Sequence, residues 1–188
     1  IHEDMVARPL APYGASKLAV EGYCSAYAAC YGMSIACLRF SNVYGPGSLH
    51  KGSVVAHFIK RLMQNGELVI YGDGSQRRDF LFVRDLMQGI ETAILGSVTG
   101  VLQLGSGTPT SLNELLDALR AMLGSRFASP VRYEGFRPGE VRDTWCDISR
   151  ARRALGFNPR TSLAEGLRLT WDWFEGAIAG RAGTGAFR

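Results

Sequence analysis

A tyrosine and a lysine four residues apart, Tyr13 and Lys17, are the side chains whose types and spacing most directly suggest chemistry. On a helix this spacing puts both side chains on one face. A free phenol has a pKa of about 10 and is a weak base at neutral pH, but a neighbouring ammonium group favours the phenolate. The pair therefore predicts a general acid/base unit, although an ordinary surface contact between Tyr and Lys would have the same spacing.

Arginine is the other residue type that could bind a ligand. The sequence has 21 Lys and Arg residues, of which 18 are Arg, and a net charge of +4. A guanidinium group matches the oxygens of a phosphate with two parallel hydrogen bonds, so this composition favours compact anions such as phosphates. No dense basic run occurs, which argues against a nucleic-acid partner.

The composition indicates a globular protein. With 188 residues, 46% hydrophobic and 20% charged, the chain can form one sizeable core, or a core and a small lobe. The same values exclude a disordered, a collagen-like and a coiled-coil chain. No run of about 18 apolar residues is present and no secretory signal opens the chain, so we expect no membrane partner and a cytoplasmic location.

Four cysteines, Cys24, Cys30, Cys37 and Cys146, form no CxxC pair. Structural zinc sites usually contain such pairs, so a metal site is not expected. In a cytoplasmic protein we expect the four thiols to be reduced and mostly buried.

The elements that must position the reactive side chains follow from apolar spacing and from Gly and Pro positions. Helices are predicted over residues 16–31, 54–65, 84–95, 111–123, 149–155 and 162–178, and strands over 34–40, 68–71, 79–83, 101–105 and 131–133. Residues 42–47 are predicted to form a loop. Strands and helices alternate in the first half, which predicts an α/β fold with a parallel sheet, whereas the second half has the shorter elements of a smaller lobe.

Four sequence blocks, in order along residues 9–175, together carry a resemblance to a known family. They are residues 12–21 (PYGASKLAVE), 38–47 (LRFSNVYGPG), 70–80 with 83–86 (IYGDGSQRRDF, VRDL), and 137–142 with 155–159 (RPGEVR, LGFNP). The series resembles the extended short-chain dehydrogenases/reductases that act as NAD-dependent nucleotide-sugar epimerases and dehydratases, above all the UDP-glucose 4-epimerase branch. It implies the C-terminal part of a Rossmann-type parallel sheet plus a smaller α/β substrate-binding lobe.

The resemblance implies NAD as the cofactor and gives three residues a role beside it. Tyr13 would move the proton of the sugar hydroxyl group. Lys17 would bind the ribose of the nicotinamide and stabilise the Tyr13 phenolate. Phe40 would lie beside the nicotinamide ring.

The resemblance also implies a pocket for a nucleotide-diphosphate sugar, and three residues would contact the diphosphate. Asn42 would donate a hydrogen bond to it, and the guanidinium groups of Arg78 and Arg137 would clamp it. In the plainer interpretation, Asn42 is a turn residue and the two arginines are solvated at the surface.

Three further residues would contact the nucleoside. Val55 and Tyr71 would line the pocket of the base, or simply pack in the core, and Glu140 would accept a hydrogen bond from a ribose hydroxyl group. His2 and His57 belong to no group of reactive residues and are interpreted as structural.

The glycine-rich fingerprint of a dinucleotide site, a GxxGxxG that opens a helix after a strand, does not occur in this sequence. We therefore expect the chain to correspond to the C-terminal half or more of such an enzyme, and not to catalyse epimerisation by itself. On this interpretation residues 1–50 end the NAD-binding domain. Residues 51–180 form mainly the substrate-binding lobe, with returning Rossmann elements at about 80–105, and residues 181–188 form a flexible tail.

The predicted activity is NAD-dependent epimerisation of a nucleotide-diphosphate sugar, such as UDP-glucose or UDP-galactose, through a transient keto-sugar. A 4,6-dehydratase, a decarboxylase or a reductase on the same scaffold is an alternative. A non-catalytic remnant that binds a nucleotide sugar or a partner protein is another. The helix over residues 16–31 carries apolar side chains around much of its circumference, so we also expect a homodimer that forms through it.

Overall fold

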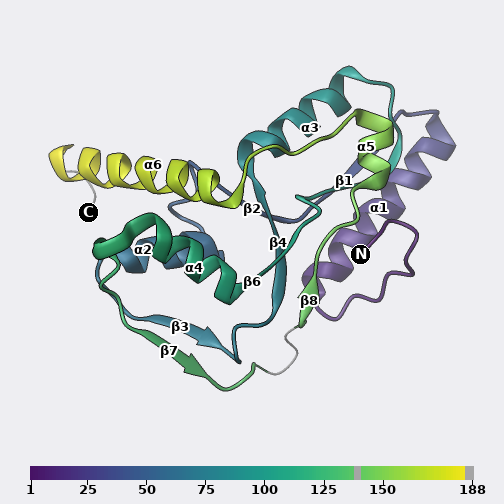
Figure 1. The fold of residues 1–188 in the computed structure, drawn as a ribbon. Coiled ribbons are helices and arrows are strands. Elements are labelled where there is room, and N and C mark those ends of the chain that lie inside the picture. Colours follow the sequence, from purple (N-terminus) through teal and green to yellow (C-terminus); the bar gives the residue numbers. More distant parts are fainter. Residues whose placement is uncertain (138–140, 185–188) are drawn as a thin grey trace.

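The computed structural model describes residues 1–137 and 141–184 and has an α/β architecture (Figure 1). The strands are β1 (Ala36–Phe40), β2 (Asn42–Tyr44), β3 (Leu68–Tyr71), β4 (Arg77–Phe82), β5 (Gly100–Leu104), β6 (Pro109–Ser111), β7 (Val131–Glu134) and β8 (Asp143–Thr144). The helices are α1 (Pro12–Tyr31), α2 (Val54–Met63), α3 (Val83–Leu95), α4 (Leu112–Leu123), the short 3₁₀ helix η1 (Gly124–Arg126), α5 (Ser149–Leu155) and α6 (Leu163–Thr184). The predicted fold class is confirmed.

Most strands pair in parallel with a strand that is distant in the sequence. β1 pairs with β5, β2 with β4, and β3 with β7. β4 also pairs with β6, antiparallel, and with β8, parallel. Parallel neighbours need crossover connections, and in each of the first three pairs at least one helix lies between the two strands along the chain.

The predicted loop over residues 42–47 is wrong in its first half, because residues 42–44 form β2. The Ser41 N–H still donates to the Leu104 carbonyl of β5 at 3.0 Å, whereas residues 42–44 lie opposite residues 80–82 of β4. The chain therefore changes its partner strand at Ser41. The Asn and the Gly-Pro pair nearby favour a turn locally, and only the pairing with β4 makes these residues a strand.

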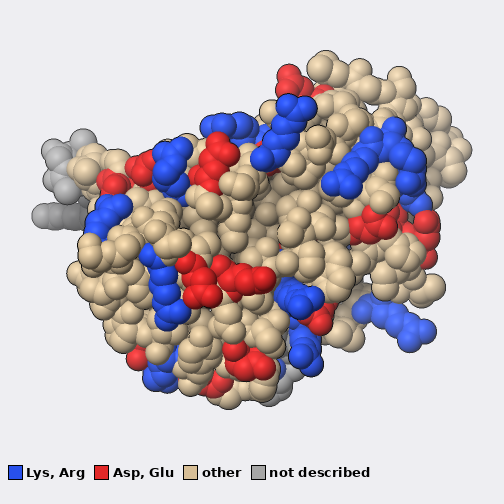
Figure 2. All heavy atoms as spheres, viewed as in Figure 1, with Lys and Arg blue, Asp and Glu red and all other residues tan. Residues whose placement is uncertain are grey.

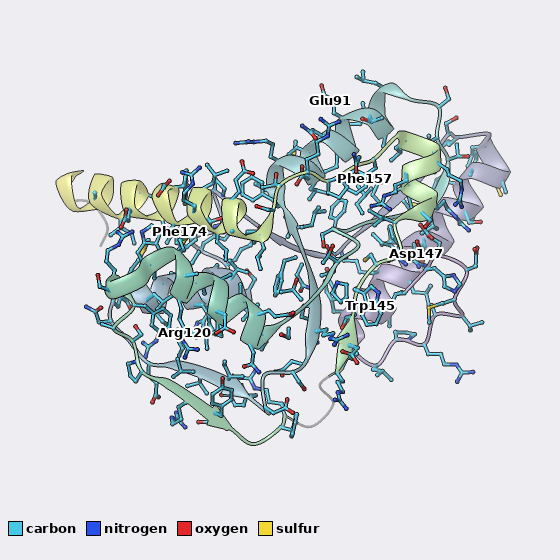
Figure 3. All side chains as sticks on the ribbon, viewed as in Figure 1. Glu91, Arg120, Trp145, Asp147, Phe157 and Phe174 are labelled. Carbon is cyan, nitrogen blue, oxygen red and sulfur yellow. The ribbon has the colours of Figure 1, made fainter. Side chains whose placement is uncertain are left out.

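A hydrophobic core lies on each face of β4. Phe80 and Phe82 belong to the core that includes α2, α4 and α6, while Leu81 between them belongs to the core with α3, β5 and α5. This division follows because successive side chains of a strand point to opposite faces. Figure 3 labels one buried residue of each core, Phe174 on α6 and Phe157 just after α5.

Two buried carboxylates fix the loops around β4. Asp79, 1% exposed, accepts hydrogen bonds from the backbone N–H groups of residues 106, 107 and 146 at 2.7, 3.0 and 3.2 Å. Asp85 on α3 accepts from the N–H groups of residues 160 and 161 at 3.2 and 3.0 Å. A buried charge is tolerated when hydrogen bonds satisfy it, so these two carboxylates stabilise the fold.

α1 packs loosely against the rest of the chain. It contains no buried residue, and it begins at Pro12, earlier than the predicted residue 16. Proline suits this first position because its missing N–H would have no partner there. The expectation of mostly buried thiols is wrong: Cys30 on α1 is exposed, and the other three cysteines are only partly buried.

The other helix ends mostly follow the sequence signals. Ser111 and Glu114 form the expected capping box at the start of α4. α6 continues to Thr184, beyond the predicted end at residue 178, and residues 185–188 lie outside the described residues. In the part of the chain that the structure describes, no helix is long and apolar enough to cross a membrane.

Candidate functional site

A pocket of about 650 Å³ opens between α2, β3 and the start of β4. Its wall includes five of the six predicted substrate-binding residues: Asn42, Val55, Tyr71, Arg78 and Arg137. They come from β2, α2, β3, β4 and the segment after β7, so the fold gathers residues that are far apart in the sequence. The sixth, Glu140, lies outside the described residues.

One wall of the pocket is cationic. The Arg137 guanidinium lies 3.5 Å from the centre of the Tyr71 ring, an arrangement in which the positive charge faces the electron-rich ring. Arg78 donates from Nη1 to the carbonyls of Arg77 at 2.9 Å and of Arg142 at 3.1 Å. A guanidinium group has five N–H donors in a planar fork, a geometry that matches the oxygens of a phosphate.

This cationic wall does not belong to a continuous basic surface on the face drawn in Figure 2. There the Lys and Arg side chains are interspersed with Asp and Glu. That face therefore has no extended basic surface of the kind that a long polyanion binds.

Part of the lining is apolar. Val55 and Phe58 of α2 are 1% and 2% exposed, and Val69 of β3 lies beside them in the lining. Asn42 also lies in the lining and donates from Nδ2 to the Asp79 carbonyl at 3.2 Å. The pocket thus has one part suited to a planar apolar ring and another suited to phosphate oxygens.

Five polar residues of the lining were not expected there: Ser53, His57, Arg61, Glu67 and Gln76. His57, interpreted from the sequence as structural, thus lies in the lining of the pocket. His57 and Arg61 follow Val54 at helical spacing, next to the apolar face of α2, and this polar stripe was the signal available in the sequence. Burial, with Lys60 and Arg61 nearby, lowers the pKa of the His57 imidazole and favours its neutral form.

The predicted acid/base pair forms at the start of α1, outside this pocket. The Lys17 Nζ lies 5.3 Å from the centre of the Tyr13 ring, and Tyr13 is 73% exposed. Phe40, at the end of β1, is 50% exposed. Two residues after Phe40 the chain reaches Asn42 in the pocket wall, so β1 and β2 connect the two groups of predicted site residues.

A bidentate ion pair holds α1 against β1. Arg39 donates from Nε and Nη2 to the two carboxylate oxygens of Glu21, both at 2.7 Å. Glu21 follows Tyr13 and Lys17 at four-residue steps on the same side of α1, and Arg39 directly precedes Phe40. Hydrogen bonding from Arg39 lowers the pKa of Glu21. The pair therefore helps to set where Tyr13 and Lys17 stand relative to β1.

The model of the family described as "NAD dependent epimerase/dehydratase family" matches residues 1–102, which is more than half of the chain. The chain belongs to the NAD-dependent epimerase/dehydratase family. This confirms the resemblance carried by the four sequence blocks. The matched part contains Tyr13, Lys17 and Phe40 as well as the pocket residues up to Arg78.

Curated relatives in this family have more than one activity. A UDP-glucuronate 4-epimerase from Thermodesulfobacterium geofontis is 34% identical over 174 residues, which cover 92% of this chain and 53% of that protein. A dTDP-glucose 4,6-dehydratase from Streptomyces griseus is 35% identical over 173 residues, which cover 92% of this chain and 52% of that protein. The chain thus spans about half the length of the curated relatives that it matches.

A solved structure of an epimerase shares the fold. The crystal structure of UDP-glucose 4-epimerase with UDP-glucose from Thermotoga maritima is similar with a TM-score of 0.88 and 33% sequence identity. The similarity covers 95% of this chain and 58% of that one.

Within residues 1–137 and 141–184, the structure contains no group of three or more His, Cys, Asp or Glu side chains that could hold a metal ion.

Proposed function

We propose that this chain contributes the substrate pocket and the acid/base residues to the NAD-dependent epimerisation of a nucleotide-diphosphate sugar, with a UDP-sugar 4-epimerase as the specific activity. The observation that carries the proposal is the pocket, whose lining combines Arg78 and Arg137 with apolar residues that include Val55. The diphosphate would bind to the guanidinium groups, and the base would lie between the apolar part of the lining and Tyr71.

The acid/base step is assigned to Tyr13. As the phenolate, its oxygen would take the proton of the sugar hydroxyl group and later return it, and the Lys17 Nζ lies 5.3 Å from the centre of its ring. The exposed ring of Tyr13, with this ammonium group, and the half-exposed ring of Phe40 fit the nicotinamide end of NAD. When bound, NAD supplies the hydride chemistry that side chains lack.

A nucleotide-sugar 4,6-dehydratase is the second candidate, supported by the 35% identity to the Streptomyces griseus enzyme. Both reactions begin with oxidation of the sugar to a keto-sugar, and they differ in what happens to it next. An epimerase releases a sugar with inverted configuration, whereas a dehydratase releases a keto-sugar that has lost water.

The test is to incubate the intact protein with NAD and, separately, with UDP-glucose, UDP-glucuronate and dTDP-glucose, and to follow the sugars by NMR. Formation of the 4-epimer supports the proposal, and formation of a keto-deoxy-sugar supports the second candidate. Tyr13→Phe is expected to lower the rate by about a hundredfold or more while the nucleotide still binds, because it removes only the hydroxyl group. Binding of UDP-sugars without any conversion would contradict both.

We also propose that the protein is a cytoplasmic homodimer that forms through α1. Four of its large apolar side chains, Leu18, Val20, Tyr23 and Tyr27, are 38–68% exposed. Such an apolar surface is normally covered by a partner. Light scattering should give twice the chain mass, and a monomer at tens of micromolar would contradict the proposal.

A further inference from the structure

Gln76 carries a polar atom that the fold does not satisfy. Its side chain is 4% exposed, and its Nε2 donates to the Tyr71 carbonyl at 2.7 Å. A carbonyl oxygen can only accept a hydrogen bond, so the end of the Gln76 amide that faces the Tyr71 carbonyl must be the NH₂ group. The other end is therefore the oxygen, Oε1. Oε1 is shielded from solvent and accepts no hydrogen bond from any described residue. Buried polar atoms nearly always have a partner, so this oxygen points to a ligand.

The residue that carries the unpaired oxygen lines the candidate site. Gln76 lines the 650 Å³ pocket together with Arg78 and Arg137, and it shares Arg137 with a smaller cavity of about 250 Å³ next to it. Gln76 and Arg78 are two residues apart in an extended segment, so their side chains leave it on the same side.

The chemistry of the oxygen differs from that of its neighbours. The two arginines only donate hydrogen bonds and suit phosphate, whereas Gln76 Oε1 only accepts and would repel phosphate oxygens. The group that it binds must therefore carry a hydrogen-bond donor and lie directly beside the diphosphate. In a nucleotide sugar, the two rings bonded to the diphosphate, the ribose and the hexose, both carry hydroxyl groups.

We propose that Gln76 Oε1 accepts a hydrogen bond from a hydroxyl group on one of these two rings. This inference rests on the proposed function, since it takes a nucleotide sugar as the ligand. Gln76 is then a specificity-determining residue, because a site built to bind a hydroxyl group discriminates against the analogue that lacks it. Ser53 Oγ, at the start of α2, is a second shielded and unpaired polar atom in a residue of the same lining, as expected of a wall that hydrogen-bonds a ligand.

The test measures the affinity of the intact protein by calorimetry for UDP, its 2′-deoxy and 3′-deoxy analogues, UDP-glucose and the monodeoxy analogues of UDP-glucose. If the ribose is the source, the wild type binds UDP about five- to tenfold more tightly than one of its deoxy analogues. If the hexose is the source, the same preference appears for UDP-glucose over one of its analogues. In either case Gln76→Met abolishes the preference.

Gln103→Met is the matched control. Gln103 is also a buried glutamine, 3% exposed, with an unpaired amide nitrogen, but it lies on β5 and does not line the pocket. It is expected to keep the preference of the wild type. If Gln76→Met does not fold, Gln76→Asn replaces it, since this variant keeps an amide and withdraws its oxygen by one methylene group.

The outcomes separate this inference from the proposed function. A wild type that binds all the deoxy analogues as tightly as their parents, or a Gln76 variant that weakens every ligand by one factor, overturns the inference and leaves the proposed function intact. A wild type that binds neither UDP nor UDP-glucose overturns both.

Discussion

Arg78 and Arg137 reach the pocket with different supports, and this difference determines what their substitution would do. Arg78 lies on β4, and its guanidinium group donates to two backbone carbonyls. The guanidinium group of Arg137 instead packs on the Tyr71 ring. Arg78→Ala therefore removes a group fixed by the backbone. Arg137→Ala also uncovers Tyr71, which we assign to the base pocket.

Each of these two variants is expected to weaken UDP binding about tenfold or more, because a hydrogen bond to a charged group contributes about 1.5–3 kcal/mol. Calorimetry with UDP measures this directly. Arg120→Ala is the control, since Arg120 also lies over an aromatic ring, 5.5 Å from the centre of Phe127, but outside the pocket. Unchanged affinity in both pocket variants would refute the diphosphate assignment.

At the scale of elements, the contact between α1 and β1 matters most, since α1 carries Tyr13 and Lys17 and has no buried residue. Arg39→Met removes the bidentate pair with Glu21. We expect a loss of about 1–2 kcal/mol in the stability of α1 docking, lower activity and unchanged UDP affinity. Hydrogen exchange should show faster opening of α1. Arg168→Met, which breaks an exposed pair with Asp172, is the control and should change none of these.

The same pair makes the docking of α1 dependent on pH. Arg39 lowers the pKa of Glu21, so the stabilisation is fully present above the ordinary Glu pKa of about 4.3. It is lost as the pH falls through the lowered value, where the carboxylate of the folded protein is protonated. In the wild type, acid should therefore weaken the protection of α1 against hydrogen exchange. Glu21→Gln should lack this acid-dependent loss of protection. The same loss in the variant as in the wild type would contradict the assignment of the pH dependence to Glu21.

The sequence predicts elements well where the signal is local and less well where it depends on a partner. The start of α4 was predictable because Ser111 and Glu114 satisfy each other within one turn. β2 was not, since residues 42–44 become a strand only by pairing with β4. Five pocket residues were found through the family resemblance, but the place of His57 in the lining depends on how α2 turns toward β3.

At the scale of the whole molecule, the buried Asp79 joins β4 to the loops that follow β5 and β8. Gly105 leaves it room: a Cβ at this position would lie 2.5 Å from Asp79 Oδ2. Gly105→Ala is therefore expected to lower the free energy of unfolding by about 1–3 kcal/mol, measured by urea denaturation. Gly22→Ala is the matched control, because a Cβ there meets nothing within 4 Å, and it should raise helix stability slightly. Equal stability of the two variants would contradict the close contact.

The two cores on either side of β4 have a consequence for how the family can vary in sequence. Phe80, Leu81 and Phe82 alternate between those cores, so a single inserted or deleted residue within β4 would send each ring and the leucine to the wrong side. A change between Arg78 and Phe80 could not keep both Arg78 at the pocket and the two rings in their core. We therefore expect this strand to tolerate substitutions of similar size but not a change of length, and we expect insertions to be tolerated only in the loops on either side.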